Sequence, residues 1–267
     1  MMRVFVLLVV PALLVAQSGR TSSVPRMGGK PDLTGVWQGG STTAGSWEEA
    51  NRGVGVGGSG KDPSAPALPS SNDRVGDGPP YQEAAAKKVM ESYKMRGIDD
   101  PTARCLPPGL PRANTLGLFP IQIIQTPQQV VMLYEYMAVF RVIPLNAKHR
   151  DDVEPSYMGD SVGHWEGDTL VVDVTNFNDK TWLGGGTGTF HSDAMHITEK
   201  YTRISKDRIN YTAIIEDPKV FTKPWVIESS MMLREGTHLG EYVCAENNID
   251  TGRYEEMIKN GVKFTRP

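Results

Sequence analysis

The residues best suited to acid–base chemistry gather in one short run of the sequence, which contains His191, Asp193, His196 and Glu199. An imidazole titrates near neutral pH and can exchange protons with a substrate, and a neighbouring carboxylate can orient it. These four residues are therefore candidate catalytic residues. The alternative for each histidine is a solvent-facing or hydrogen-bonded structural role, because ionisable groups support structure as well as chemistry.

Strand alternation limits which of these side chains can share a site. If the run is a strand, His196 lies on one face, whereas Glu199 and Tyr201 lie on the other. Either His196 faces a pocket with His191 folded over it, or Glu199 does so together with Tyr201. The first arrangement is the favoured prediction, because the preceding loop places His191 and Asp193 on the rim.

Other side chains are candidates for holding a ligand beside this group. Arg141 joins the catalytic candidates because a guanidinium can hold an anionic or carbonyl group, although a surface ion pair is the alternative. Asp173 and Asn176 end another predicted strand, where Asp173 points outward or into a polar interior. For Trp225, packing in the core is the simpler interpretation. The ligand-binding candidates are Trp165, Asp173, Asn176, Tyr201 and Trp225.

Metal and nucleophile chemistry have less support. His191 and His196 do not have the helical His-x-x-x-His spacing of metalloproteases, and the cysteines form no paired zinc pattern. We therefore expect neither a tightly bound metal nor a cofactor. The segment Gly159–Gly163 has the Gly-x-Ser-x-Gly spacing of a nucleophile elbow, but that motif needs a strand, a turn and a helix. A turn with two glycines is the preferred interpretation.

Short strands separated by turns must position these residues. Their even spacing, with almost no helix between them, predicts a mainly β protein with an antiparallel barrel or sandwich. The predicted strands are Ile121–Thr126, Val130–Tyr136, Val139–Ile143, Thr169–Thr175, Met195–Ile204, Arg208–Glu216, Trp225–Leu233 and Glu241–Cys244, with Trp165 before the fourth. One helix is predicted over Tyr81–Arg96, and its Ala85, Val89 and Tyr93 face should dock on the main body.

The start of the chain has the layout of a secretory signal over residues 1–18. Arg3 supplies a positive charge, an apolar run follows to Ala16, and cleavage is expected near Ser18. This run is short for a bilayer span, although a retained anchor is the alternative. We therefore expect an exported protein, periplasmic or extracellular, with no stable membrane insertion after signal cleavage.

The mature chain divides into two parts. Residues 19–100 hold a first strand, a flexible Gly/Ser/Pro-rich segment that includes Gly53–Gly60, and the helix. Residues 101–267 form the antiparallel β domain, which the strand around 32–38 completes. The only two cysteines, Cys105 and Cys244, are predicted to form a disulfide outside the cytoplasm. A net charge of −3 gives no field that favours nucleic acid, so a small molecule is the expected partner.

Several segments resemble known proteins. Gly35-Val36-Trp37 resembles the opening of lipocalin-like barrels, in which the Trp plugs one barrel end; an ordinary strand with a buried Trp is the alternative. Most of the chain also resembles a large family of secreted bacterial proteins that are mostly uncharacterised. The segments that carry this resemblance are Pro31–Trp37, Cys105–Gly109, Trp165–Asp173, His191-Ser192, Met195-His196, Asp217-Pro218, Pro224-Trp225 and Glu241–Cys244.

The family resemblance implies a secreted protein but no established activity and no catalytic residues. Members often read Cys-His-Glu-Gly-Asn near the end, where this chain has Cys244-Ala245-Glu246-Asn247-Asn248. If that histidine served chemistry in relatives, this chain lacks it.

Three functional hypotheses follow. The first is a cofactor-independent lyase, isomerase or hydrolase that uses His and carboxylate groups on a small molecule. The second is a lipocalin-like carrier for an apolar or phenolic ligand. The third is an envelope or interaction protein without a pocket. Convergent His and carboxylate groups would favour the enzyme, an apolar lining the carrier, and a filled interior the third hypothesis.

Overall fold

The computed structural model describes residues 23–39, 79–94, 100–117, 119–184, 188–246 and 248–262. The predicted signal peptide and the Gly-rich run Gly53–Gly60 lie outside these residues. Within this part of the chain no helix combines the length and apolar character needed to cross a membrane.

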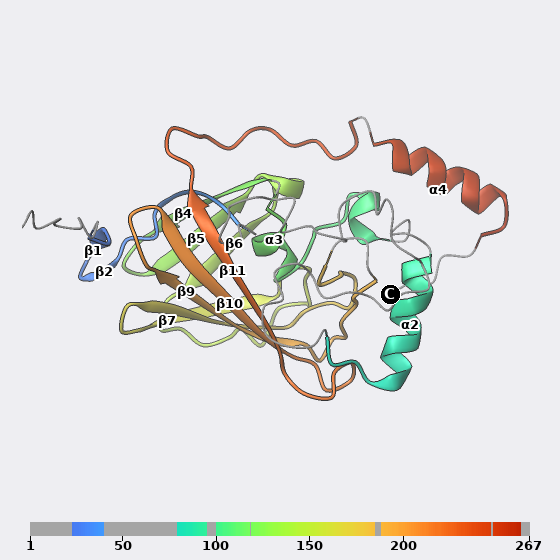
Figure 1. The fold of residues 1–267 in the computed structure, drawn as a ribbon, viewed down its shortest axis with the longest axis horizontal. Helices are drawn as coiled ribbons and strands as arrows, with labels where there is room; N and C mark the ends of the chain where they lie inside the picture. The colour runs from blue at the N-terminus through green and yellow to red at the C-terminus, as the bar shows by residue number, and fades with distance from the viewer. Residues whose placement is uncertain are drawn as a thin grey trace, which may run out of the picture.

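The described residues form one large antiparallel sheet of nine strands (Figure 1). Its order is β6-β5-β4-β3-β11-β10-β9-β8-β7, and every neighbouring pair is antiparallel. The strands are β3 Gly35–Gln38, β4 Pro120–Gln125, β5 Gln129–Tyr134, β6 Phe140–Pro144, β7 Asp160–Glu166, β8 Thr169–Thr175, β9 His196–Arg203, β10 Arg208–Glu216 and β11 Trp225–Leu233. The predicted mainly β, antiparallel fold is therefore confirmed.

The sheet curls until its two outer strands meet. β6 and β7 share no ladder, but Leu145 and Gly163 form a parallel bridge, and the Asn146 N–H donates to the Gly163 carbonyl at 2.7 Å. The result is a nearly closed barrel with one weakly joined line, which we call the seam. Closure removes most of the exposed edge that an open sheet would present.

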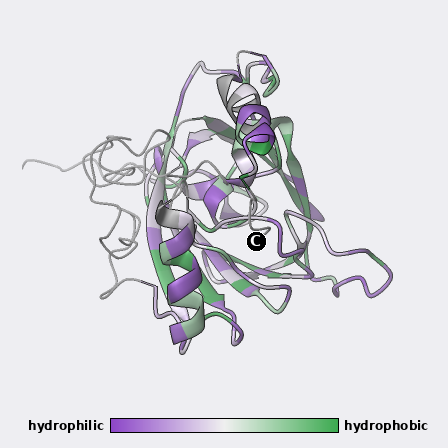
Figure 2. Ribbon diagram, turned by 90° about the vertical axis from the view of Figure 1, so that its right-hand side faces the viewer, coloured by the Kyte–Doolittle hydropathy of each residue, from purple (hydrophilic) through white to green (hydrophobic). Residues whose placement is uncertain are grey.

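Alternation along each strand sorts side chains between the core and the outside. In β9, Ile197, Glu199 and Tyr201 are buried, whereas His196 and Thr198 on the other face are partly exposed. The inward side chains of all the longer strands join one continuous hydrophobic core. Figure 2 shows hydrophobic colouring concentrated in the strands and hydrophilic colouring on the helices in front of them.

Trp37 lies buried toward one end of the barrel, which we call the Trp37 end. The Trp37 indole is fully buried and donates from Nε1 to the Leu33 carbonyl at 2.9 Å. The Arg203 guanidinium lies over its ring, 5.0 Å from the centroid. A two-stranded ribbon, β1 Arg26–Met27 with β2 Lys30–Pro31, flanks this end, where Arg26 pairs with Asp168 of the β7–β8 turn.

The other end, which we call the disulfide end, carries the helices (Figure 1). They are α2 Glu83–Lys94, η1 Pro101–Arg104, α3 Arg112–Thr115 and α4 Ile249–Lys259, with the short turn η2 Tyr136–Ala138 between β5 and β6. The predicted helix is confirmed as α2, and its Ala85 and Val89 are buried. The predicted disulfide is also present: Cys105 and Cys244 are bonded, with their Cα atoms 5.6 Å apart.

The disulfide anchors a C-terminal strap, residues 234–246, that runs from the end of β11 back along the barrel (Figure 1). The strand predicted at Glu241–Cys244 is wrong, because this segment makes no ladder. It is held instead by the disulfide and by Tyr242, whose ring packs against Phe119 and Tyr136. The helix α4 was not predicted; its sequence is polar and interrupted by Gly252.

The Gly159–Gly163 segment also differs from its prediction. It is not a turn with two glycines, because Ser161 and Gly163 lie inside β7. Gly159 precedes the strand at φ +67°, and a Cβ there would crowd the Thr175 carbonyl and Val174. Glycine is therefore required at the point where the chain enters the seam.

Candidate functional site

A buried ion pair crosses the barrel interior. Arg141 of β6 donates from Nη2 to Glu199 Oε2 of β9 at 2.7 Å, and both side chains are almost completely buried. The same nitrogen donates to Ser161 Oγ of β7 at 2.9 Å, so Arg141 spans the seam. Burial opposes the charge of Arg141, but the Glu199 carboxylate outweighs it and holds the Arg141 pKa well above its ordinary value.

The Glu199 carboxylate is fully hydrogen-bonded. Its Oε1 accepts from Asn114 Nδ2 at 2.7 Å, from Tyr201 OH at 3.1 Å and from Tyr211 OH at 2.7 Å. Burial and the carboxylate charge raise the pKa of Tyr201 and Tyr211 well above the ordinary value. Both phenols therefore stay protonated donors, which a buried carboxylate requires.

Tyr134 and Asn114 complete this cluster. The Tyr134 hydroxyl donates to Asn114 Oδ1 at 3.0 Å, and burial raises its pKa to about 12. Asn114 lies on α3, so the disulfide-end segment supplies one donor to the barrel interior. Arg112 of the same helix is buried as well and forms a two-pronged ion pair with Asp100, which fixes the segment.

Arg141 is not fully paired, and neither is Arg112, whose Nε also lacks a partner among the described residues. The Nε and Nη1 of Arg141 are buried and have no hydrogen-bond partner among the described residues. Buried N–H groups of native proteins are nearly always paired, and an unpaired one calls for an explanation such as a missing ligand. Both nitrogens also have almost no contact with solvent, so bulk water does not pair them.

A pocket of about 440 Å³ lies at this place. We call it the seam pocket; it is bounded by the start of β6, by β7 and by the loop of residues 145–159 that joins them. Its mostly apolar walls are Pro107, Val139, Phe140, Val142, Tyr157 and Met158. Its polar lining comes from Arg141, Arg150, Ser156 and Ser161. Phe140 is 67% exposed and Val142 43% exposed, so apolar surface continues from the pocket onto the outer face of β6.

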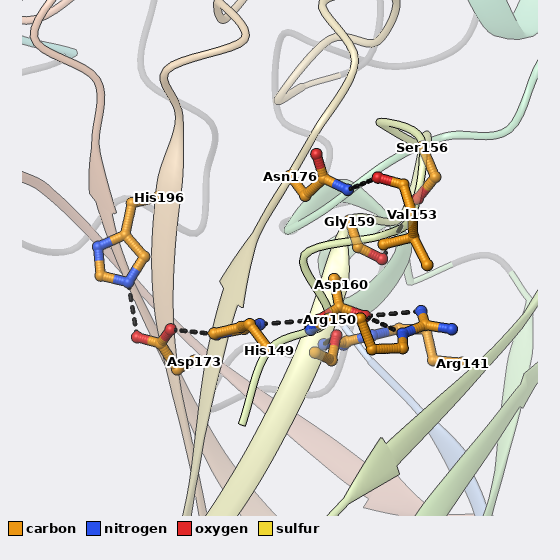
Figure 3. Close-up of polar contacts among 11 residues, drawn as sticks. Arg141, His149, Arg150, Val153, Ser156, Gly159, Asp160, Asp173, Asn176 and His196 are labelled. Atoms are coloured by element: carbon orange, nitrogen blue, oxygen red, sulfur yellow. Dashed lines mark hydrogen bonds and ion pairs between the residues drawn. The ribbon is translucent and has the colours of Figure 1, made fainter. Parts of the chain in front are cut away.

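The loop that walls the pocket is tied to the strand end at Asn176. Asn176 Nδ2 donates to the Val153 carbonyl at 3.0 Å (Figure 3), and its carbonyl accepts from the Ser156 N–H at 3.1 Å. Asn176 adopts φ +57°, which asparagine tolerates better than most residues. The predicted ligand-binding candidate Asn176 thus positions a pocket wall rather than lining the pocket.

A chain of alternating carboxylates and imidazoles holds the other end of the loop. His149 lies between Asp160, at 2.9 Å from Nδ1, and Asp173, at 2.6 Å from Nε2. His196 Nε2 contacts the second Asp173 oxygen at 2.6 Å, and Arg150 donates from Nε to Asp160 at 2.8 Å. Figure 3 shows His196, Asp173 and His149 joined in one line across the outer face of β8 and β9.

The pKa shifts of His149, Asp160 and Asp173 all favour the charged forms of these side chains. Burial disfavours the charged imidazole of His149, but its bonds to Asp173 and Asp160 outweigh burial and raise its pKa. Burial would raise the pKa of both carboxyls, yet the bonds from the imidazoles and, at Asp160, from Arg150 lower it. These shifts favour a protonated His149 between the two carboxylates, an arrangement that would fasten the loop to the strands.

The structure separates the residues that were predicted to act together. His191 is buried, and its ring contacts structural groups: Nδ1 donates to the Ser192 carbonyl, Nε2 contacts the Thr181 hydroxyl, and the ring lies edge-on to Phe177. Burial lowers its pKa, which favours the neutral imidazole. Asp193 is exposed and pairs with Lys219 at 2.6 Å. The predicted rim of His191 and Asp193 around a shared pocket is not formed.

The favoured orientation of His196 is wrong. His196 lies on the outer face of β9 between Asp173 and Glu216, whereas Glu199 and Tyr201 point into the barrel. The loop entering β9 does not turn back over His196, because Asp217 binds it through the Ser192 N–H and hydroxyl. The alternative arrangement, with Glu199 and Tyr201 inward, is the one that occurs.

The other ligand-binding candidates lie outside the seam pocket. Asp173 points outward and belongs to the imidazole chain. Trp225 is a core residue, as the simpler interpretation expected, and Trp165 packs partly buried against the core near Lys30. Ligand contacts by these residues stay predictions.

Sequence reasoning missed several members of the site. Tyr134 lies two residues after the buried Met132, and Tyr211 lies two residues after the buried Ile209. The period-two pattern could therefore have placed both tyrosines on the inward face. His149 and Arg150 lie in an irregular loop, and Asn114 in a four-residue helix, where no periodic pattern exists. Among the described residues no group of three or more His, Cys, Asp or Glu side chains could hold a metal ion.

Comparison with protein-family models and with curated proteins finds no match for this chain. The resemblance to a secreted bacterial family therefore stays a hypothesis, and the assignment of function depends on the site itself.

Proposed function

We propose that this chain is an exported binding protein for a small molecule, and that the ligand occupies the seam pocket. The observation that carries the proposal is the coincidence of a pocket with a buried guanidinium whose Nε and Nη1 lack partners. A pocket of several hundred cubic ångströms with apolar walls and few polar groups is typical of small-molecule sites.

Binding without turnover is the function that the lining supports best. The described residues that line the pocket include two arginines and two serines, but no carboxylate and no imidazole. Glu199 and Asp160 are the acids paired with the two lining arginines. The oxygens of Glu199 are already bonded to Arg141, Asn114, Tyr201 and Tyr211. Those of Asp160 are bonded to His149 and Arg150. General acid–base catalysis needs a group that can reach the substrate's proton, and none of the predicted acid–base residues lines the pocket.

The proposed function corresponds to the hypothesis of a small-molecule carrier, but it puts the ligand at a different place in the barrel. In a lipocalin-like carrier the barrel encloses the ligand, whereas here the inward side chains form one continuous core. The ligand therefore lies at the seam, between β6 and the 145–159 loop. The disulfide supports the proposal that the protein functions in an oxidising compartment, the periplasm or the extracellular space.

A pair of matched variants tests the proposal. Val142 lines the seam pocket on the outer face of β6, while Ile124 lies on β4 outside it. Both residues pair with Val131 on the same face of the sheet, and both are partly exposed. A tryptophan is well accepted on a half-exposed strand, so Val142→Trp fills the pocket whereas Ile124→Trp adds the same bulk elsewhere.

Purified wild type and both variants are incubated with a metabolite extract, and the retained compounds are identified by mass spectrometry. We expect wild type and Ile124→Trp to retain the same compounds and Val142→Trp to lose them. Equal retention by all three folded proteins, or retention by none, would overturn the proposal.

A further inference from the structure

We infer that the ligand of the seam pocket is a small carboxylic acid with an apolar body, whose carboxylate is bound by Arg150 at the mouth and Arg141 at the base. This inference rests on the proposed function and names the chemical class of the ligand. It follows from the charges, the unpaired donors, the walls and the size of the pocket.

The charged side chains that line the pocket are all positive. Arg150 and Arg141 both belong to the lining, and the described lining residues include no Asp or Glu. Asp160 holds Arg150 from the side of the imidazole chain, through Nε and Nη2. The Arg150 side chain remains 65% exposed, so its guanidinium is open to a second acceptor.

Arg141 supplies the deeper donors. Its Nη2 is used by Glu199 and Ser161, which fixes the plane of the guanidinium. Its Nε and Nη1 carry unpaired N–H groups that point to different sides of the guanidinium, so each can donate one charge-assisted hydrogen bond to a carboxylate oxygen. A ligand oxygen entering the seam would remove the cost of leaving these groups unbonded.

The apolar walls of the seam pocket favour a ligand that is apolar apart from its carboxylate. Phe140, Val142 and Met158 contribute apolar surface, and Tyr157 adds an aromatic ring. Exposed apolar side chains at a pocket mouth gain when a ligand covers them, at roughly 25 cal/mol for each Å² of apolar area buried. A purely polar anion such as inorganic phosphate would leave this surface uncovered.

The charge balance favours a single negative charge. Arg141 is already neutralised by Glu199, and Arg150 shares Asp160 with His149. The pocket can therefore compensate a monoanion through unpaired N–H groups, but it has no surplus cations for a dianion such as a phosphate monoester. A volume of about 440 Å³ suits a molecule with one ring or a short branched chain.

The test uses matched probes that differ only in the acceptor group. A panel of aryl- and alkyl-substituted acetic, propanoic and butanoic acids is compared with the corresponding primary amides, by calorimetry and ligand-observed NMR. We expect at least one acid to bind about 10-fold more tightly than its amide, which corresponds to the gain from one charge-assisted hydrogen bond.

Two arginine variants locate the contact. Arg150→Gln should weaken binding of that acid by about 10-fold and leave the amide unaffected. Arg26→Gln is the control, because Arg26 is also an exposed arginine paired with one aspartate, at the Trp37 end. For the buried arginine, the double variant Arg141→Met/Glu199→Leu removes both charges together, and it should bind the acid no better than the amide.

The outcomes separate this inference from the proposed function. If Val142→Trp abolishes retention of metabolites but these are neutral, and the acids bind no better than the amides, the ligand class is wrong and the pocket assignment stands. If Arg150→Gln and Arg26→Gln weaken the acid equally, the arginine assignment is wrong. If wild type retains nothing that Val142→Trp loses, and binds neither acids nor amides, both proposals fail.

Discussion

Two buried arginines occupy opposite parts of the barrel, and they are satisfied in different ways. Arg203 at the Trp37 end donates to the carbonyls of Asp32, Ser205 and Lys206 and lies over the Trp37 ring. Arg141 at the seam has one carboxylate and one hydroxyl for its Nη2, and its other two nitrogens have no partner.

The difference distinguishes a structural arginine from a candidate binding residue. Every nitrogen of Arg203 is bonded, so the residue can only hold the barrel end together. Arg141 is held just as firmly, but it keeps donors that no described residue uses, and it borders a pocket. Burial alone would not have told the two apart, because Arg203 is 6% exposed and Arg141 4% exposed.

The largest expected effect comes from removing the counter-ion at the seam. Glu199→Leu leaves the Arg141 charge buried without its carboxylate, which should lower the free energy of unfolding by about 3–5 kcal/mol. Urea denaturation followed by tryptophan fluorescence measures this change. Arg141→Met/Glu199→Leu should recover much of the loss, because neither charge is then left unpaired. A single variant as stable as wild type would mean that the ion pair contributes nothing.

The second-largest expected effect is the loss of stability at the disulfide end when the disulfide is reduced. The bond between Cys105 and Cys244 links residues 139 positions apart, and a long closed loop favours a large entropic contribution. We expect reduction to lower the free energy of unfolding by about 2–5 kcal/mol. Amide exchange should accelerate in segment 100–116 and in the strap, and stay slow around Trp37. Uniform acceleration in both regions would contradict the independence of the two barrel ends.

At the Trp37 end, Arg203→Met should cost about 2 kcal/mol, because three carbonyls lose a donor and the ring loses its cation. Water can reach part of this site, so the loss stays below that of Glu199→Leu. The seam pocket should bind its ligand unchanged in this variant, which calorimetry can check. A loss of ligand affinity that equals the effect of Arg150→Gln would show that the two ends are coupled.

The strands could be predicted because alternation is a local property of the sequence. In β8, alternation puts Leu170, Val172 and Val174 on one face and Asp173 on the other, and the three aliphatic side chains are indeed buried. Closure could not be predicted, since it depends on β6 meeting β7 across a 15-residue loop without a sheet pattern. The same alternation places Glu199 inward, but the favoured site relied on a loop closing over His196, and loop conformation depends on distant partners such as Asp217.

For the same reason, the cluster at the seam could be predicted only in part from the sequence. Arg141 and Glu199 were both recognised as candidates, yet nothing local in the sequence shows that strands 58 residues apart bring them to 2.7 Å. His149 lies in the loop, and its importance depends on Asp160 and Asp173 lying on either side of it.

The smallest expected effect is a pH dependence that the seam loop shows and the Trp37 end does not. The pKa of His149 is raised above 6.5 in the folded protein, so its contribution is fully present below 6.5 and is lost as pH rises through the raised value. The pKa values of Asp160 and Asp173 are lowered below 3.8, so their contributions hold above 3.8 and are lost as pH falls through the lowered values. The loop is therefore held most firmly between pH 3.8 and 6.5.

A comparison of wild type with His149→Gln isolates this contribution. Glutamine keeps hydrogen-bonding capacity but cannot carry the charge, so the difference in unfolding free energy should be about 1 kcal/mol near pH 5.5 and should shrink above neutral pH. The Trp37 end provides the internal control, because the carbonyls that bind Arg203 do not titrate. Arg203→Met should therefore cost the same at pH 5.5 and pH 8.5. A His149→Gln difference that stays constant over this range would mean that the imidazole is held by its shape and hydrogen bonds rather than by its charge.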